Sequence, residues 1–243
     1  MKGIIKKSYH DYLDTDIKLS LSKSLQDEEK RMVVTLNAEH IMISDKNKQL
    51  KGILLDKMVT LIPDSISIKF AIRKLINQKI EPFNGIELFV FLLNEANEQS
   101  KSLYLFGASK EVNQKMRLMI KNQYPNIKLL GCEDGYISDF NLIKDKILKA
   151  QPDLIAVALG VPKQELFSYN VYKEIHKGIF IGVGGSFDIL TNHIKRAPKW
   201  ARKLSLEWLY RIVKEPRRLR RFWDNNVKFI WRVMIKNDKK CSD

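Results

Sequence analysis

One carboxylate stands where a proton acceptor would be useful. Asp64 directly follows the apolar segment Met58–Pro63, MVTLIP, whose composition predicts a β-strand that ends there. A carboxylate at the mouth of a sheet can take the proton from a substrate hydroxyl and so act as a general base. The alternative is structural, because Asp64 could instead cap a helix that begins near Ile66. The residue types leave both interpretations open.

A glycine-rich turn, Gly182–Asp188 with the sequence GVGGSFD, follows another apolar segment. Gly184 and Gly185 would let the backbone approach a phosphate group closely, because glycine has no side chain and adopts positive φ readily. The spacing is not that of a dinucleotide-binding fingerprint, and a tight strand-to-helix turn explains the glycines equally well. Asp188 would either cap the next helix or bind a sugar or ribose hydroxyl, and of these two we favour the cap.

The chain offers little to a metal ion. Asp14-Thr15-Asp16 matches the short D-x-D pattern with which many nucleotide-sugar transferases hold a divalent cation, but such a pattern recurs by chance and here precedes the first expected strand. The histidines show no ligand spacing with each other or with the cysteines; these residues are His10, His40, His176, His193, Cys132 and Cys241. We therefore predict no metal site and no cofactor.

Positive charge is concentrated at one end of the chain. Residues 195–243 hold 16 Lys and Arg against 5 Asp and Glu, whereas the preceding 194 residues hold 27 against 23. A charge imbalance confined to one end indicates contact with a polyanion. The candidates are nucleic acid, an anionic membrane surface and a phosphorylated substrate.

The basic segment also has the two-sided pattern of an amphipathic helix, because at about 100° per residue its cationic and apolar side chains separate. The cationic set is Arg217, Arg221, Lys228, Arg232 and Lys236, and the apolar set is Leu219, Phe222, Trp223, Ile230, Val233 and Met234. This separation favours a helix on anionic lipid over a nucleic-acid-binding module, which would interleave aromatic and basic residues on one surface. A terminal helix packed on its own domain, with a solvated basic face, is the further alternative.

The elements that would position these groups alternate along the chain. Short apolar segments predict strands at 32–36, 58–62, 103–106, 127–130, 154–158 and 178–182. Segments with helical spacing lie at 39–50, 66–77, 86–99, 111–123, 140–150 and 163–175. This alternation predicts an α/β fold with a largely parallel sheet, in which ligands bind at the carboxyl ends of the strands. We expect residues 1–194 to form this core and residues 195–243 a basic helical appendage.

The hydropathy of the chain bears on its location. The N-terminal segment lacks the apolar core of a signal peptide, and no segment approaches the ~18 apolar residues of a membrane span. Two widely separated cysteines suit a reducing compartment. We therefore expect a protein that stays on the cytoplasmic side of the membrane.

Several motifs occur together in a fixed order. They are TLNAEH (35–40), Pro63-Asp64, NGIEL (84–88), GCEDGY (131–136), GVPKQE (160–165), GVGGSFD (182–188), RAPKW (196–200), LEWLYR (206–211) and EPRR (215–218). Each motif alone is short. The ordered set, which covers roughly residues 31 to 225, resembles the WecG/TagA/CpsF glycosyltransferases, glycosyltransferase family 26.

The resemblance implies a Rossmann-like core with a C-terminal appendage, working at the cytoplasmic face of the bacterial cell membrane. Members of that family invert configuration, need no metal, and move a sugar, often N-acetylmannosamine, from a UDP-sugar to an undecaprenyl-diphosphate-linked sugar. Such a reaction serves the synthesis of teichoic acid or another cell-surface polysaccharide. The implied partners are the UDP-sugar donor, the polyprenyl-diphosphate-linked acceptor and an anionic membrane surface, and not nucleic acid. No oligomeric state is predicted.

The resemblance also assigns roles to residues. Asp64 would be the base that deprotonates the acceptor hydroxyl, and Thr35 and Asn37 would line the same pocket. Two further groups would contact the substrates. The first, beside the nucleotide sugar, is Tyr136, Gln164, Gly184, Gly185 and Asp188; the second, which would close over the pocket and face diphosphate, is Arg211, Arg218 and Arg221.

Several positions depart from the family pattern. The family has glycines after the aspartate, as D-G-x-G, where this chain has Asp64-Ser65-Ile66-Ser67; Thr191-Asn192 replaces Ala-Gly, and Ile137 replaces Phe. Serine adopts positive φ less readily than glycine, so we expect the loop after Asp64, and with it the choice of sugar, to differ. A paralogue that binds UDP-sugar without turning it over is the alternative to an active enzyme.

Overall fold

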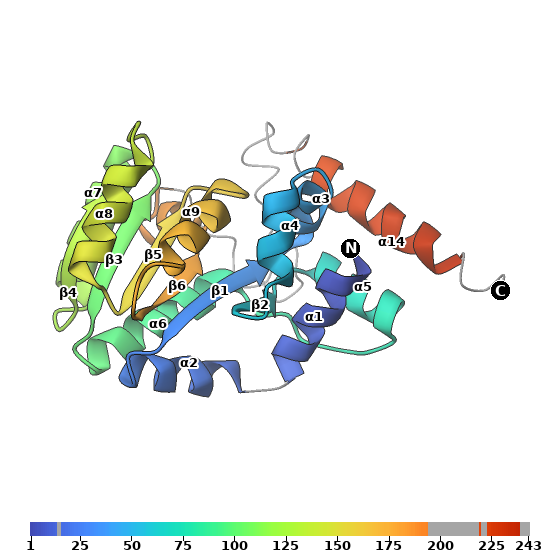
Figure 1. The fold of residues 1–243 in the computed structure, drawn as a ribbon, viewed down its shortest axis with the longest axis horizontal. Helices are drawn as coiled ribbons and strands as arrows, with labels where there is room; N and C mark the ends of the chain where they lie inside the picture. Colours follow the sequence, from blue (N-terminus) through green and yellow to red (C-terminus); the bar gives the residue numbers. More distant parts are fainter. Residues whose placement is uncertain (14–15, 194–218, 220–222, 239–243) are drawn as a thin grey trace.

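The computed structural model describes residues 1–13, 16–193, 219 and 223–238, and these form a six-stranded parallel sheet between helices (Figure 1). The strands are β1 (Lys30–Leu36), β2 (Val59–Pro63), β3 (Ser102–Gly107), β4 (Lys128–Glu133), β5 (Leu154–Ala158) and β6 (Gly178–Gly182). Their order is β2-β1-β6-β5-β3-β4, which places β1 beside β6 although they are far apart in sequence. The predicted α/β, Rossmann-like fold is confirmed.

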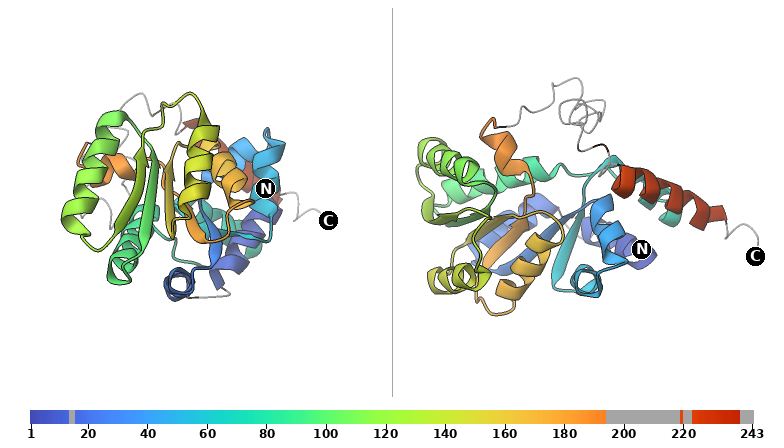
Figure 2. Two further views of the ribbon diagram at one scale, coloured as in Figure 1. Left: turned by 60° about the vertical axis from the view of Figure 1, so that its left-hand side comes forward. Right: turned by 90° about the horizontal axis from the view of Figure 1, so that it is seen from above.

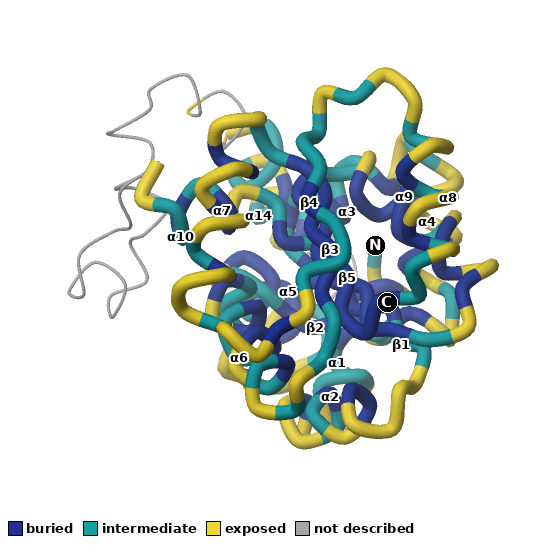
Figure 3. Tube along the Cα trace, turned by 90° about the vertical axis from the view of Figure 1, so that its left-hand side faces the viewer, coloured by how far each residue is buried: buried dark blue, intermediate teal, exposed yellow. Residues whose placement is uncertain are grey.

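Every predicted strand is present, and the inner strands are apolar on both faces. β5, LIAVA, is buried at all of its positions. Its side chains alternate between two hydrophobic clusters, with Ile155 and Val157 in one and Leu154 and Ala156 in the other. Figure 3 shows this pattern as a buried centre enclosed by exposed helices and loops. A parallel sheet covered on both faces needs such strands, and their composition made them recognisable.

Helices cover both faces of the sheet (Figure 2). One face carries α1 (Lys2–Leu13), α3 (Ala38–Ser44), α4 (Lys48–Leu55), α5 (Ile66–Ile76), α8 (Phe140–Ala150), α9 (Lys163–Tyr172) and α14 (Lys228–Asp238). The other carries α2 (Ile17–Gln26), α6 (Gly85–Glu98), α7 (Lys110–Gln123) and α10 (Ser186–Leu190). A π-helical turn, η1 (Trp223–Val227), leads directly into α14.

The helix expected at 39–50 is two helices, α3 and α4. Asp45 ends the first, and Asn47 caps the second by accepting a hydrogen bond from the Leu50 amide at 2.9 Å. Both caps lie inside the predicted helix 39–50, whose spacing of apolar residues continues without a break across them. Local capping chemistry therefore divides what periodicity alone presents as one helix.

The N-terminal helices α1 and α2 were not predicted. Asp16 caps α2, because its carboxylate accepts hydrogen bonds from the amides of Lys18 and Leu19 at 3.1 and 3.2 Å. Asp16 of the D-x-D motif thus has a local structural role, whereas Asp14 and Thr15 lie outside the described residues.

The C-terminal helix α14 packs on the domain. It lies against α5 and α3 (Figure 1). Its side chains Phe229 and Val233 are fully buried in the hydrophobic cluster of that face. Arg232 forms an ion pair with Asp45 at the end of α3. The assignment of the whole apolar side to lipid is therefore wrong for Val233 and for the partly buried Ile230, which face the protein.

Other apolar side chains of the C-terminal segment are exposed. Trp223 and Trp231 are 58% and 64% exposed, and Met234 and Ile235 are exposed as well. In the ranges that the structure describes, no helix is long and apolar enough to cross a bilayer. Of the remaining members of the predicted amphipathic pattern, Leu219 and Lys228 are exposed, whereas Arg217, Arg221, Phe222 and the side chain of Lys236 lie outside the described part.

Asp153, just before β5, forms hydrogen bonds to the starts of β3 and β6 at the amino edge of the sheet. Its carboxylate accepts hydrogen bonds from the backbone amide and hydroxyl of Ser102, where β3 starts, and from Lys177 at 2.8 Å, just before β6. Its carbonyl accepts a hydrogen bond from the Ile179 amide at 2.9 Å. Burial acts to raise the pKa of Asp153, but the hydrogen bonds from Lys177 and Ser102 outweigh it and hold that pKa below its ordinary value.

We predict that Asp153→Asn lowers the free energy of unfolding by about 2 kcal/mol at pH 7, because asparagine carries no charge and offers one acceptor oxygen where the carboxylate offers two. Since the folded-state pKa of Asp153 is depressed, the carboxylate's contribution is present above the unfolded value near 3.9 and is lost as pH falls through the folded-state pKa. Urea unfolding between pH 3 and 7 checks this. The difference in stability between the two proteins should begin to shrink as pH falls below about 4.

The control is Asp145→Asn, which removes an exposed carboxylate from α8. Its free energy of unfolding should stay within about 0.5 kcal/mol of the wild type at pH 7. Equal destabilisation by the two substitutions would contradict the role of Asp153.

Candidate active site

The register of β1 and β2 brings the candidate base to the carboxyl edge of the sheet. Leu36 pairs with Pro63, and the Asp64 amide donates a hydrogen bond to the Leu36 carbonyl at 2.8 Å. The N-cap of α5 is Ser65, so the alternative in which Asp64 caps this helix is wrong. Asp64 thus stands in the loop between the end of β2 and the start of α5.

The side chains of Asp64 and Thr35 lie beside Gly85, the first residue of α6. A Cβ atom on Gly85 would lie 3.3 Å from Asp64 Oδ2 and 3.4 Å from Thr35 Oγ1. The two side chains therefore converge on one point at the amino end of α6, where Asn84 caps the helix through the Ile86 amide at 3.1 Å. The structure brings together two of the residues predicted for the reacting centre.

The third of these residues, Asn37, caps α3. Its Oδ1 accepts hydrogen bonds from the amides of Glu39 and His40 at 3.0 and 3.3 Å. His40 reaches back, with Nδ1 3.2 Å from the Asn37 amide and Nε2 3.1 Å from Glu165 Oε1. A carboxylate only accepts hydrogen bonds, so Nε2 carries the proton and Nδ1 accepts from Asn37. Asn37 is thus joined to a residue that lies far along the chain.

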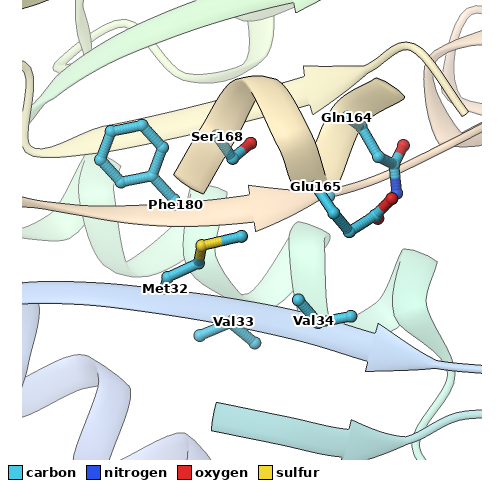
Figure 4. Close-up of a pocket in the computed structure, with 8 residues that line it drawn as sticks. Met32, Val33, Val34, Gln164, Glu165, Ser168 and Phe180 are labelled. Atoms are coloured by element: carbon cyan, nitrogen blue, oxygen red, sulfur yellow. The ribbon is translucent and has the colours of Figure 1, made fainter. Parts of the chain in front are cut away.

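Glu165 extends this network to two more loops. Gln164 Nε2 donates to Glu165 Oε1 at 2.6 Å, and Gln164 Oε1 accepts from the amides of Gly160 and Gly184, both at 3.2 Å. Figure 4 shows the side chains of Gln164 and Glu165 close together at the amino end of α9. A Cβ atom on Gly182 would lie 2.6 Å from Gln164 Nε2, so only glycine fits there.

The network is buried beneath the carboxyl edge. His40 and Glu165 are each 2% exposed and Gln164 is 4% exposed. A small gap beside them is also lined by Met32 and Ser168 (Figure 4). Within the described ranges, Glu165 Oε2 and the Ser168 hydroxyl have no hydrogen-bond partner. The loops after β1, β5 and β6 are therefore fixed to one another by side chains that are themselves immobilised.

The glycine-rich turn after β6 is tight, as predicted. Gly184 has φ of 48°, a conformation that favours glycine, and its amide is held by Gln164. Gly185 is the N-cap of α10 and provides no side chain for capping. Asp188 lies inside the first turn of α10, half-buried. The interpretation of Asp188 as the cap is therefore wrong, and its role as a ligand for a sugar hydroxyl stays a prediction.

Tyr136 lies apart from this cluster. Its side chain is 85% exposed on the loop after β4, and its amide donates to Asp134 at 2.9 Å. β4 and β2 are the two outer strands of the sheet, roughly 24 Å apart at about 4.8 Å per strand spacing. Tyr136 and Asp64 follow opposite outer strands, so a substrate that contacts both would have to extend along the carboxyl edge of the sheet.

The arginines predicted to face diphosphate, Arg211, Arg218 and Arg221, lie outside the described residues. Among the residues that are described, no group of three or more His, Cys, Asp or Glu side chains could hold a metal ion. The site that the structure defines consists of Thr35, Asp64 and Gly85 above the buried network.

Three of these residues were not among the predicted site residues: Gly85, His40 and Glu165. Their signal was present in the motifs NGIEL, TLNAEH and GVPKQE, which contain them. What the motifs could not indicate is that His40 and Glu165, 125 positions apart, meet in the interior.

A parallel sheet with a carboxylate, a hydroxyl and glycine-rich turns along its carboxyl edge is the architecture of an α/β protein that binds its ligand at that edge. The model of the family described as "Glycosyl transferase WecG/TagA/CpsF family" matches residues 11–241. The chain therefore belongs to this family and is a glycosyltransferase.

Two relatives bear the same name, N-acetylglucosaminyldiphosphoundecaprenol N-acetyl-beta-D-mannosaminyltransferase. The protein of Bacillus subtilis (strain 168) is 36% identical over 190 residues, which is 78% of this chain and 74% of the relative. The protein of Bacillus spizizenii (strain W23) is 33% identical over 190 residues, which is 78% of this chain and 73% of the relative. The similarity thus extends over most of both chains.

We predict that Gly85→Ala lowers kcat for sugar transfer roughly tenfold while changing stability little. The added methyl group would stand 3.3 Å from Asp64 Oδ2, so the carboxylate must shift, and small displacements of a reacting group reduce rates strongly. Gly52→Ala in α4 is the control, because its Cβ would meet nothing within 4 Å. Steady-state kinetics and thermal melts of both variants check this. A Gly85→Ala enzyme with the wild-type kcat would contradict the proximity argument.

Proposed function

We propose that this enzyme transfers N-acetylmannosamine from a UDP donor to N-acetylglucosamine carried on undecaprenyl diphosphate, with inversion at the anomeric carbon. The names of the two Bacillus relatives support the transferred sugar and the lipid-linked acceptor. The family supports sugar transfer as the reaction class. The product would serve teichoic acid or another cell-surface polysaccharide.

The convergence of Asp64 and Thr35 at Gly85 is the observation that carries the proposal. Asp64 accepts the proton of the acceptor hydroxyl while that oxygen attacks the anomeric carbon. The bond from this carbon to the diphosphate oxygen breaks, and UDP leaves with the electron pair. Attack from the side opposite UDP inverts the configuration, so one carboxylate acting as base is sufficient.

The departing diphosphate needs compensation for its growing negative charge. We assign this role to Arg211, Arg218 and Arg221, because the planar guanidinium group binds phosphate oxygens in pairs and stays charged. Tyr136, Gln164 and Asp188, with Gly184 and Gly185, are assigned to the donor side. Gln164 would act there through the loop amides that it holds.

The C-terminal segment is assigned to the cytoplasmic surface of the cell membrane. Trp223, Trp231, Met234 and Ile235 are exposed apolar side chains on a segment that also carries Lys228 and Arg232. Tryptophan and aliphatic side chains enter the interfacial region of a bilayer, while basic groups meet anionic headgroups. Contact with the membrane would keep the enzyme beside its lipid-linked acceptor.

We predict that the enzyme transfers N-acetylmannosamine from its UDP donor to a short-chain lipid diphosphate N-acetylglucosamine in the presence of EDTA. Asp64→Asn should lower kcat by roughly 10²–10⁴-fold, the contribution of a general base. Mass spectrometry of the product and NMR of its anomeric configuration are the measurements. Asp145→Asn serves as the control and should retain the wild-type rate.

Three results would contradict this proposal. Absence of transfer with every plausible UDP-sugar would exclude the reaction, and binding of UDP without turnover would identify an inactive paralogue. Retention of the wild-type rate by Asp64→Asn would exclude the assigned base.

For the membrane, we predict that Trp223→Ala/Trp231→Ala lowers partitioning onto phosphatidylglycerol-containing vesicles about tenfold, because two exposed aromatic side chains no longer enter the interface. Co-sedimentation at increasing salt measures both the apolar and the electrostatic contribution. Leu118→Ala on α7 is the control, since Leu118 is 59% exposed outside this segment. Equal partitioning of all three proteins would remove the membrane role.

A further inference from the structure

The loop after Asp64 has an uncommon backbone conformation. Ser65 has φ of 87° and ψ of 153°, a region that glycine occupies almost exclusively. A residue with a side chain stays in this region only where the surrounding structure holds it there. The residue preceding Ser65 is Asp64, so whatever holds Ser65 also sets the direction of the Asp64 backbone.

A chain of hydrogen bonds leads from Ser65 to the C-terminal segment. The Ser67 hydroxyl donates to Asn226 Oδ1 at 3.0 Å, and the hydroxyl oxygens of Ser65 and Ser67 lie 3.0 Å apart. A serine hydroxyl has one proton, so Ser67, having donated to Asn226, accepts the hydrogen bond from Ser65. Asn226 thus determines which hydroxyl donates and which accepts in the series Ser65, Ser67 and Asn226.

The position of Asn226 is fixed by the elements around it, η1 and α14. It lies in the π-helical turn η1, a type of irregularity that is frequent at functional sites. The helix α14 that follows is anchored by the buried side chains of Phe229 and Val233 and by the ion pair of Arg232 with Asp45. The position of Asn226 therefore depends on the docking of α14 against α5 and α3.

We infer that Asn226 is a positioning residue for the base, an inference that rests on the proposed role of Asp64. Asn226, through Ser67, holds Ser65 in its left-handed conformation and so keeps the Asp64 carboxylate directed at Gly85, beside Thr35. In this chain the serines that follow Asp64 supply, by hydrogen bonding to η1, a restraint that glycines could not supply. Docking of the C-terminal helix is thereby coupled to the geometry of the reacting centre.

The test compares Asn226→Ala with Asn225→Ala, which removes the same amide group from the preceding position of η1. Asn226→Ala should lower kcat about tenfold with KM within about twofold, as expected when an interaction is needed in the transition state rather than for substrate binding. Asn225→Ala should leave both constants near the wild type. Asn226→Asp keeps the acceptor oxygen and should recover most of kcat.

A double-mutant cycle tests the path through Ser67. Ser67→Ala should resemble Asn226→Ala, and the double variant should be no slower than either single variant, because both remove the same link. The inference would be overturned if the double variant lost the product of the two single losses in kcat. It would also be overturned if Asn226→Ala kept the wild-type kcat.

A second measurement does not require activity. Amide hydrogen exchange in a peptide covering residues 64–69 should be faster in Asn226→Ala than in Asn225→Ala, with exchange across β5 unchanged. If exchange is faster in Asn226→Ala but the Asp64→Asn enzyme keeps its full activity, the structural link between Asn226 and the loop is retained and the assignment of Asp64 as the base is wrong. Unchanged exchange together with an unchanged kcat would remove the link and leave the proposed function standing.

Discussion

The carboxylate of Glu165 is the group on which the arrangement of the site depends. It is almost completely buried, and a buried carboxylate is stable only where hydrogen-bond donors compensate for the lost water. His40 and Gln164 both donate to its Oε1, whereas Oε2 has no hydrogen-bond partner among the described residues. Each of them is in turn bound to backbone: His40 to the turn after β1, and Gln164 to the turns after β5 and β6. One desolvated charge thereby fixes three loops that come from distant parts of the sequence.

Asp64 is held differently, from both layers of helices at once. On one side stands the amino end of α6, where Gly85 leaves only enough room for the carboxylate and the Thr35 hydroxyl. On the other side α5 begins at the strained Ser65, which is linked through Ser67 to η1. A base set between two packed layers is restricted in direction without the large desolvation that Glu165 experiences. This arrangement suits a carboxylate that must reach a substrate and still be accessible to it.

The fold was largely predictable because a buried parallel strand has a composition that few other elements share. β5 and β6 stand out as apolar segments, and the carboxyl-edge placement of Asp64 followed from β2 alone. Helix α2 was not predicted although Ile17, Leu21 and Leu25 form a buried stripe, because the helix is short and the residues between its apolar positions are mostly polar.

The site was less predictable, since the contacts that define it are not local. His40 and Glu165 are each unremarkable beside their neighbours, and only the β1–β6 pairing and the packing of α9 bring them within hydrogen-bond distance. The frequency of aspartate at helix N-caps predicts a capping role for Asp188, but the N-cap of α10 is Gly185, which has no side chain to form a capping hydrogen bond.

In the C-terminal helix, amphipathic spacing alone does not distinguish apolar residues that could face lipid from apolar residues that pack on the protein. Phe229 and Val233 are one helical turn apart and lie in the core, while Trp231, Met234 and Ile235 are exposed. Both groups are apolar, so a helical wheel places too much of the helix against the membrane. Because the buried pair and the Arg232–Asp45 ion pair fix the rotation of α14 on the domain, the exposed group has a fixed direction relative to Asp64. A helix that binds a bilayer through that exposed group would therefore also set the orientation of the reacting centre toward a lipid-linked substrate.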